Sequence, residues 1–256
     1  MGLFHRRLPN GLEVAQVDPG EAALLYREIF VEGSYLREGF PTTPLKTIVD
    51  VGANIGLASI FFKQHHPDAL VVAIEPGPDT FQALQENFTR HVPGGIARNV
   101  AASDRNGTAR FGYYPKSPAE SGFYAEQAED TELARQLLIQ TGLSERDAGR
   151  LAESRHAISY LECETVTLSE LFRQAGLDRI DLLKIDVEKA EREVLAGIEA
   201  ADWARIGHVV LEVHDIEGRL EQTLDLLRGH GFTVDVAQEA RLADTDMYMI
   251  FAARTA

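Results

Sequence analysis

Four ionisable side chains follow two apolar runs of this sequence at a spacing that suits proton transfer. Asp186 and Glu188 end the run LLKIDVE, and Glu212 and His214 end the run VVLEVH. The members of each pair are two residues apart, so they point to the same side of an extended segment. Because an imidazole titrates near neutrality, we expect His214 to act as a general base. Asp186 or Glu188 would orient this base or bind the hydroxyl that loses its proton, and Glu212 completes the candidate catalytic set.

These side chains also have simpler interpretations. His214 can be a solvated histidine at a strand end, and the two acids after the first run can stabilise the start of a helix. The three acids also offer the hard oxygen ligands of a divalent ion, but nothing in their spacing requires one, so we expect no metal. Lys184 lies within the apolar run, where an unpaired charge is costly, and we expect it to reach an acid such as Asp50 or Glu212.

The stretch TIVDVGANIGLAS predicts a strand, a glycine turn and a helix. Gly52 and Gly56 allow a tight turn and a close approach of a ligand to the backbone. A dinucleotide site needs glycine where this chain has Asn54 and Leu57, which argues against it. S-adenosylmethionine requires only an acid at the strand end, followed by such a turn. We therefore expect Asp50 to serve its methionyl amino group, directly or through water, and the turn residues from Gly52 through Asn54 to Gly56 to line the site. A turn without a ligand is the alternative.

The next two strand ends are expected to hold the rest of the same ligand, because ligands of open α/β sheets bind beyond the carboxyl ends of the strands. Glu75 and Pro76 end the almost wholly apolar run LVVAIEP, and a carboxylate there can accept both ribose hydroxyls. The third strand ends in small residues, of which Ala102 and Ser103 make room for the edge of the adenine ring. The alternatives are an exposed Glu75 and simple packing of the small residues.

From residue 46 to residue 256, short apolar runs alternate with amphipathic stretches. This alternation predicts a doubly wound α/β domain with a largely parallel sheet and right-handed crossovers. The expected strands are TIVDV, ALVVAIEP, GIARNVAAS, TARFGYYP, DLLKIDV, GHVVLEVH, FTVDVA and DMYMIFAA.

Residues 1–45 are expected to form an N-terminal helical appendage, because apolar residues recur at helical spacing in LLYREIFVEGSYL. Glu32 and Tyr35, close to the first strand, are expected to contact the methionyl end of the ligand or to close the site. Residues 116–157 form a polar, helix-prone insertion between sheet elements, which we interpret as a lid, with a peripheral helical decoration as the alternative. The aromatic pairs Tyr113-Tyr114 and Phe123-Tyr124, near the start of the insertion, either line a substrate site or pack internally.

The composition restricts the partners of the chain. Its 40 acidic and 25 basic residues give a net charge of −15, which disfavours nucleic acid and anionic lipid surfaces. No apolar run is long enough to span a membrane, and no signal peptide is recognisable. The lone cysteine, Cys163, cannot form an internal disulfide, so we expect a cytoplasmic location. Nothing in the sequence indicates an oligomeric state.

Taken in order, the segments IVDVGANIGLAS, VVAIEPGPDTFQALQENF, VTLSELF, DLLKIDVEKAEREVLAG and VVLEVH resemble the FkbM family of S-adenosylmethionine-dependent methyltransferases. The likeness runs from about residue 46 to residue 214. The family pattern after the fourth strand reads LKIDVEGAE, and here Lys189 replaces the usual glycine, which puts the local turn geometry in question.

The resemblance implies a class I methyltransferase fold with a seven-stranded, mostly parallel sheet. It also implies methyl transfer from S-adenosylmethionine, usually to a hydroxyl of a sugar, polyketide or peptide natural product, with an acceptor that is a free small molecule or is tethered to a carrier. The alternatives are N-methylation, an NAD-dependent oxidoreductase and a domain that binds the donor without turnover.

Overall fold

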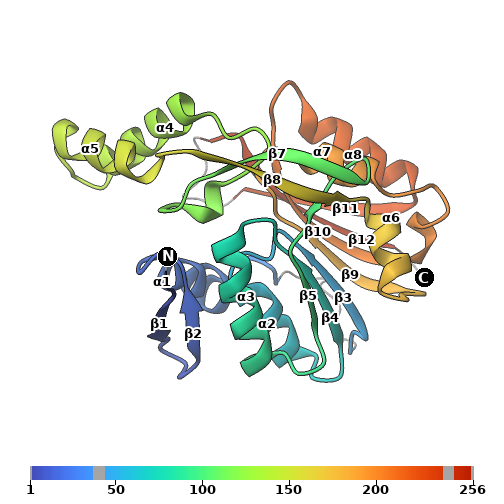
Figure 1. Cartoon of the computed structure of the whole chain (residues 1–256). Helices are drawn as coiled ribbons and strands as arrows, with labels where there is room; N and C mark the ends of the chain where they lie inside the picture. Colours follow the sequence, from blue (N-terminus) through green and yellow to red (C-terminus); the bar gives the residue numbers. More distant parts are fainter. Residues whose placement is uncertain (1, 37–43, 239–244, 255–256) are drawn as a thin grey trace.

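The computed structural model describes residues 2–36, 44–238 and 245–254, and its centre is a sheet with helices on both faces (Figure 1). The sheet has seven strands in the order β11-β12-β10-β9-β3-β4-β5. All neighbouring pairs are parallel except the two that involve β12. The strands are β3 (Thr47–Val51), β4 (Leu70–Ile74), β5 (Ile96–Arg98), β9 (Ile180–Ile185), β10 (Ile206–His214), β11 (Phe232–Ala237) and β12 (Met247–Arg254). This arrangement confirms the predicted doubly wound, mostly parallel sheet.

Both faces of the sheet are apolar and covered. In β3, Ile48 belongs to one core and Val49 to the other, because successive side chains of a strand point to opposite faces. A sheet buried on both sides needs such continuous apolar strands. The helices that cover one face are α2 (Leu57–His65) and α3 (Pro78–His91), and those that cover the other are α6 (Leu168–Gln174), α7 (Glu191–Ala196) and α8 (Arg219–Gly229).

The strand order reverses at β3, which has β4 on one side and β9 on the other. The carboxyl ends of β3, β4, β9 and β10 therefore meet at the switch point where α/β sheets bind ligands. The register of β3 and β9 places Asp50 opposite Lys184. Asp50, Glu75, Asp186 and His214, which lie far apart in the sequence, are thus brought to one edge of the sheet.

The N-terminal segment differs in part from its prediction. A hairpin of β1 (Phe4–Arg7) and β2 (Glu13–Gln16) precedes the expected helix, which runs as α1 (Glu21–Tyr26) into a π-helical turn (Arg27–Glu32). The hairpin escaped prediction because the side chains of β1 are all exposed and carry no apolar alternation. Its inner strand is held by Asn87 of α3, whose side chain exchanges two hydrogen bonds with the backbone of Ala15, at 2.7 and 2.9 Å.

The expected third strand, residues 95–103, is divided between two sheets. Its first part is β5, and its last residues form β6 (Ala101–Ala102) in a separate three-stranded sheet of order β6-β8-β7. Here β7 (Gly107–Tyr113) pairs antiparallel with β8 (Ser159–Val166), which sequence analysis missed because most of its side chains are polar or exposed.

The insertion is helical, as predicted. It contains α4 (Gln127–Gln140) and α5 (Glu145–Arg155), which project beyond the ends of β7 and β8 on the side of the N-terminal segment (Figure 1). α4 buries no side chain, and α5 buries only Ala148 and Ala152. Among the described residues, no helix is long and apolar enough to cross a membrane.

Candidate active site

The turn between β3 and α2 requires its glycines for packing. Gly52 has a φ of +70°, and a Cβ there would lie 1.9 Å from the carbonyl oxygen of Asp186. Gly56 has a φ of +88°, and a Cβ there would lie 2.7 Å from Leu84. Between them, Asn54 also has a positive φ of 49°. A side chain at either glycine would clash, so the turn brings the backbone of β3 against the loop after β9.

Lys184 forms a buried ion pair with Asp50, as the sequence analysis predicted. Its Nζ lies 3.0 Å from Asp50 and 3.3 Å from Asp186, and it donates a 2.9 Å hydrogen bond to the carbonyl of Gly52. Burial lowers the pKa of Lys184, but the two carboxylates outweigh burial and raise it to about 12. Ser59 donates to the second oxygen of Asp50 at 2.6 Å.

This ion pair changes the role that we expected for Asp50. The carboxylate is 0% exposed and already has a cationic partner, which argues against direct contact with a methionyl amino group; contact through water stays a prediction. Lys184 bridges Asp50 and the carbonyl of Gly52, so Asp50 is linked to the glycine turn through Lys184.

Of the two N-terminal candidates, one reaches the cluster and one does not. The Tyr35 hydroxyl donates a 2.9 Å hydrogen bond to Asp186, and its ring packs on Phe62 of α2. Burial and the nearby carboxylates raise the pKa of Tyr35, so this donor keeps its proton. Glu32 is exposed and pairs with Arg27 at 2.7 Å, so the expectation that it contacts the ligand is wrong. The chain turns at Ser34 and Tyr35, which sends the two side chains in different directions.

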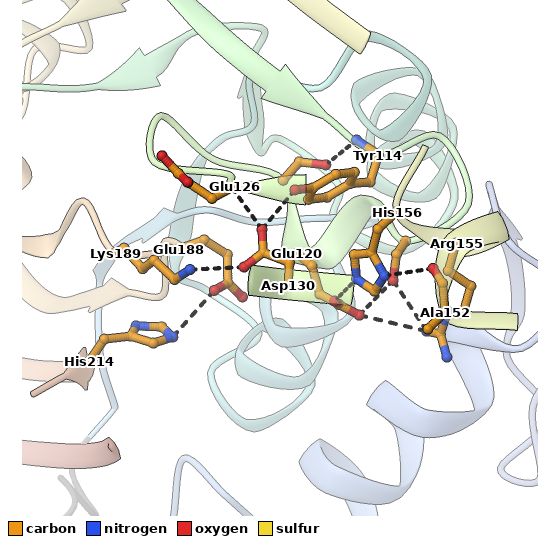
Figure 2. A network of polar contacts seen from close by, with 12 residues as sticks. Tyr114, Glu120, Glu126, Asp130, Ala152, Arg155, His156, Glu188, Lys189 and His214 are labelled. Carbon is orange, nitrogen blue, oxygen red and sulfur yellow. Dashed lines mark hydrogen bonds and ion pairs between the residues drawn. The ribbon is translucent and has the colours of Figure 1, made fainter. Parts of the chain in front are cut away.

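His214 lies between two carboxylates at the end of β10. Its Nδ1 is 2.7 Å from Glu191. Its Nε2 is 3.3 Å from Glu188, as Figure 2 shows. Burial lowers the pKa of His214, but the two acids outweigh it and raise the pKa to about 11. A pKa raised in this way favours the doubly protonated ring at neutral pH, in which neither nitrogen has a lone pair to accept a proton. The position of the ring between two carboxylates argues against His214 as the general base, so the identity of the base stays a prediction.

The three candidate acids differ in exposure. Asp186 keeps 34% of its side chain exposed and Glu188 keeps 26%, whereas Glu191 is almost fully buried. Burial raises the pKa of Glu188, and burial with the neighbouring Asp186 and Glu188 raises that of Glu212 well above its ordinary value. Asp186, Glu188 and Glu212 are all partly exposed and can be reached by a substrate, whereas Glu191, which was not a candidate, cannot. Among the described residues, no group of three or more His, Cys, Asp or Glu side chains is arranged to hold a metal ion.

We expect the His214 ring to remain doubly protonated at pH 8, which ¹⁵N chemical shifts of the imidazole nitrogens measure directly. Because its folded pKa is above that of an unfolded histidine, the stabilisation is complete below about pH 6.5 and is lost as the pH rises toward 11. His230, which stacks on Trp203 and has a pKa lowered by burial, is an internal reference that should be neutral at pH 8. A neutral His214 tautomer at pH 8 would contradict the assignment.

Glu75, at the end of β4, lies in a group of buried polar atoms. Its two oxygens accept hydrogen bonds from the backbone nitrogens of Gly77, at 2.8 Å, and Asn54, at 3.0 Å. Burial raises the pKa of Glu75 to about 7. The hydroxyl oxygens of Thr80 and Tyr113 are also buried, and neither forms a well-directed hydrogen bond among the described residues. Both residues lie close to Gly77: a Cβ at Gly77 would be 3.0 Å from the Thr80 hydroxyl and 3.1 Å from the Tyr113 ring.

The remaining cofactor candidates lie around the same edge. The carbonyl of Pro76 accepts a 3.0 Å hydrogen bond from Asn99. Ala102 is buried in β6 opposite Val166, and the buried Ser103 contacts Asp104 through its hydroxyl at 3.2 Å. The assignment of Ala102 and Ser103 to the adenine remains a prediction.

The backbone conformation of Lys189 explains why the family pattern has glycine at this position. Its φ is +61°, a left-handed conformation that glycine adopts without strain. Its Nζ forms a 2.9 Å ion pair with Asp130 of α4, which also accepts a 2.7 Å hydrogen bond from the Tyr114 hydroxyl (Figure 2). The adjacent Glu188 lies against Gly122, whose missing Cβ would be 2.9 Å from its carbonyl oxygen. The insertion is therefore fastened directly beside the acidic cluster.

Lys189→Gly should leave the free energy of unfolding within about 0.5 kcal/mol of the parent chain. Relief of the left-handed strain contributes about 1 kcal/mol, which offsets the loss of a partly buried ion pair worth about the same. Lys189→Ala keeps the strain and loses the pair, so it should destabilise by about 1–2 kcal/mol. Urea unfolding compares the two variants, and equal stabilities would contradict the role of backbone strain.

Several residues of the site were not predicted. Glu191 begins α7, and only the packing of this helix beside β10 brings its carboxylate to His214. Thr80 carries no local signal, and the sequence does not connect Tyr113 with Glu75; the packing of β7 against the β4–α3 turn brings both to that carboxylate. Of the predicted aromatic pairs, Tyr113 and Tyr114 are buried at the end of β7, and Phe123 packs on Phe111.

The order of the sheet, its antiparallel strand β12 and the glycine turn at the switch point define a class I methyltransferase. Residues 50–234 match the family model of the methyltransferase FkbM domain. The chain belongs to the FkbM family, as its sequence segments indicated, and it is an S-adenosylmethionine-dependent methyltransferase.

Relatives support this assignment over nearly the whole chain. The chain is 45% identical to the 31-O-demethyl-FK506 methyltransferase FkbM of Streptomyces tacrolimicus, over 98% of this chain and 96% of that protein. It is 36% identical to the AMB antimetabolite synthetase AmbE of Pseudomonas aeruginosa, over 96% of this chain but only 12% of AmbE. A crystal structure of a methyltransferase FkbM from Methylobacillus flagellatus has the same fold, with a TM-score of 0.52 at 14% identity, over 88% of this chain and 47% of that one.

Proposed function

We propose that this chain transfers the methyl group of S-adenosylmethionine to a hydroxyl of a small molecule or natural-product intermediate. The observation that carries the proposal is the acidic cluster of Asp186, Glu188 and Glu212, which lies next to the glycine turn at the switch point of the sheet. Such a cluster provides carboxylates that can take the proton of a hydroxyl acceptor. A neutral amine acceptor has less need of such a base. The O-methyltransferase relative from Streptomyces tacrolimicus supports a hydroxyl acceptor.

The residues present fit the donor. The buried Glu75 carboxylate at the end of β4, with the hydroxyls of Thr80 and Tyr113 near it, is suited to a ligand with hydroxyls, and the glycine turn at Gly52 lies beside it at the switch point of the sheet. We assign Glu75 to the ribose, the turn from Gly52 to Gly56 with Lys184 and Tyr35 to the methionyl end, and Pro76, Ala102 and Ser103 to the adenine. When bound, S-adenosylmethionine supplies an electrophilic methyl group on a positively charged sulfur.

Glu188 is the group that we assign to proton removal. It is partly exposed, and burial raises its pKa, so its carboxylate is a stronger base than an ordinary glutamate. The His214 ring contacts the Glu188 carboxylate at 3.3 Å. Gly122 of the insertion packs against the backbone and Cβ of Glu188. Asp186 is fixed by Tyr35 and Lys184 and is placed to orient the acceptor hydroxyl. These contacts would align the acceptor oxygen with the methyl group of the donor before transfer. Such alignment supplies much of the rate enhancement of displacement reactions.

The acceptor is either free or presented by a larger assembly. In AmbE, a segment similar to this chain is part of a much longer synthetase, which supports an acceptor that is held by a carrier. The insertion with α4 and α5 is the element that we assign to covering the acceptor, because Lys189 ties it to the loop that carries Glu188. The family does not favour an NAD-dependent oxidoreductase.

Isothermal titration with S-adenosylhomocysteine, together with transfer of a labelled methyl group to hydroxylated macrolides and sugars, tests this proposal. We expect saturable binding that Glu75→Ala weakens at least about tenfold, because it loses hydrogen bonds to a charged acceptor. Glu13→Gln, an exposed position on β2, is the control and should bind as the parent chain does. Failure of the folded parent chain to bind S-adenosylhomocysteine would refute the proposal.

A further inference from the structure

One acidic side chain of the N-terminal segment lies at the donor site without a role in the machinery described so far. Glu21 is the first residue of α1, and its Oε1 accepts a 2.9 Å hydrogen bond from the Asn54 side chain. Its other oxygen, Oε2, is buried and has no hydrogen-bond partner among the described residues. A buried carboxylate oxygen without a donor is costly, so it indicates a missing partner.

Asn54 ties Glu21 to Glu75. The side chain of Asn54 donates to Glu21, and its backbone nitrogen donates to Glu75 at 3.0 Å. The positive φ of Asn54 allows both contacts from one residue. Each oxygen of Glu75 already accepts one backbone N–H group, whereas Oε2 of Glu21 accepts none. The two carboxylates therefore face the same space, and Glu21 has the more available acceptor.

We propose that Glu21 is a second ribose-binding carboxylate, whose Oε2 accepts a hydrogen bond from a ribose hydroxyl of the donor while Asn54 holds its Oε1. The inference rests on the proposed use of S-adenosylmethionine. It makes α1, which lies outside the segment matched by the family model, part of the donor site. The site is then complete only when the N-terminal segment is docked on α2.

The electrostatics of the pair agree with this role. Burial raises the pKa of Glu21 to about 7, and the pKa of Glu75 is raised to the same value with Glu21 among the causes. Asp18 and Arg155 also face Glu21, the first raising and the second lowering its pKa. With pKa values raised in this way, we expect both acids to be partly protonated at pH 7 when no ligand is bound. Hydroxyl donors and a positive sulfonium favour the ionised forms, so binding of the donor should release protons.

The experiment compares two ligands. S-adenosylhomocysteine carries a ribose and an amino-acid tail, whereas 5′-methylthioadenosine keeps the ribose and the thioether but lacks the tail. Calorimetry measures both affinities for the parent chain, Glu21→Ala, Glu21→Gln and the charge-matched control Glu13→Gln. Repeating the titrations at pH 7 in buffers of different ionisation enthalpy gives the number of protons released, and thermal unfolding verifies that each variant is folded.

Glu21→Ala should weaken both ligands by the same factor, about tenfold or more, because the lost bond is to a charged acceptor. Glu21→Gln should weaken both less and should release fewer protons, and a purely structural residue would not change that number. Glu13→Gln should match the parent chain. Unchanged affinities in both Glu21 variants overturn the inference, and so does a loss confined to S-adenosylhomocysteine, which would place Glu21 at the amino-acid tail. Absence of binding to the parent chain refutes the proposed function instead.

Discussion

Glu188→Gln should lower kcat about a thousandfold and leave the affinity for S-adenosylhomocysteine within about threefold of the parent value. The amide keeps the size of the side chain and cannot accept the proton of the acceptor, and general-base catalysis is worth about 10²–10⁴ in rate. Glu188 is not among the residues that we assign to the donor, so binding is preserved. Single-turnover methyl transfer with saturating donor measures the chemical step.

His214→Gln distinguishes the two candidates for the base. Loss of the imidazolium removes the cation that lowers the pKa of Glu188, so the acid limb of the pH–rate profile should move to higher pH while activity persists at pH 9. If His214 were the base, its variant would lose activity at every pH and Glu188→Gln would retain much of it. The two variants therefore give opposite results under the two assignments.

Lys184→Met should destabilise the protein by about 3–5 kcal/mol. The substitution leaves Asp50 as a fully buried carboxylate without its cationic partner, and breaking a buried pair from one side costs this much. The carbonyl of Gly52 loses a hydrogen bond at the same time. Urea unfolding measures the effect as a shift of the midpoint at constant slope.

The double variant Asp50→Asn, Lys184→Met is the control for this explanation. It removes both charges, so it should be less destabilised than the sum of the two single variants by about 2 kcal/mol. Additive effects would mean that the charges act independently, and a loss below about 1 kcal/mol in Lys184→Met would mean that water reaches Asp50.

The sequence predicts the strand ends of this site because they obey local rules. Apolar runs that stop at an acid identify β3, β4, β9 and β10, and the cost of a buried charge predicts that Lys184 pairs with Asp50. The β1–β2 hairpin and β8 escape such rules, since their side chains are mostly exposed and tertiary contacts hold them.

Protonation states and contacts between distant segments are the second kind of feature that the sequence alone does not predict. His214 has the sequence context of a general base, but Glu191, the first residue of α7, supplies a second carboxylate beside the ring. Glu32 was a candidate from its place before the first strand and Glu21 was not, yet the packing of the N-terminal segment pairs Glu32 with Arg27 and brings Glu21 to Asn54. Residues whose role depends on a partner from another element cannot be assigned from spacing alone.

The pairing of β7 with β8 has a consequence for exchanging the insertion between relatives. Tyr113 lies opposite Ser159 in this ladder, so the chain leaves for α4 and α5 and returns at adjacent positions. A segment with neighbouring ends can be exchanged for one of another length without disturbing the sheet, since loop closure costs little with length. A chimaera that carries the corresponding helices of a relative should therefore fold, and a changed acceptor in it would support the role that we propose for the insertion.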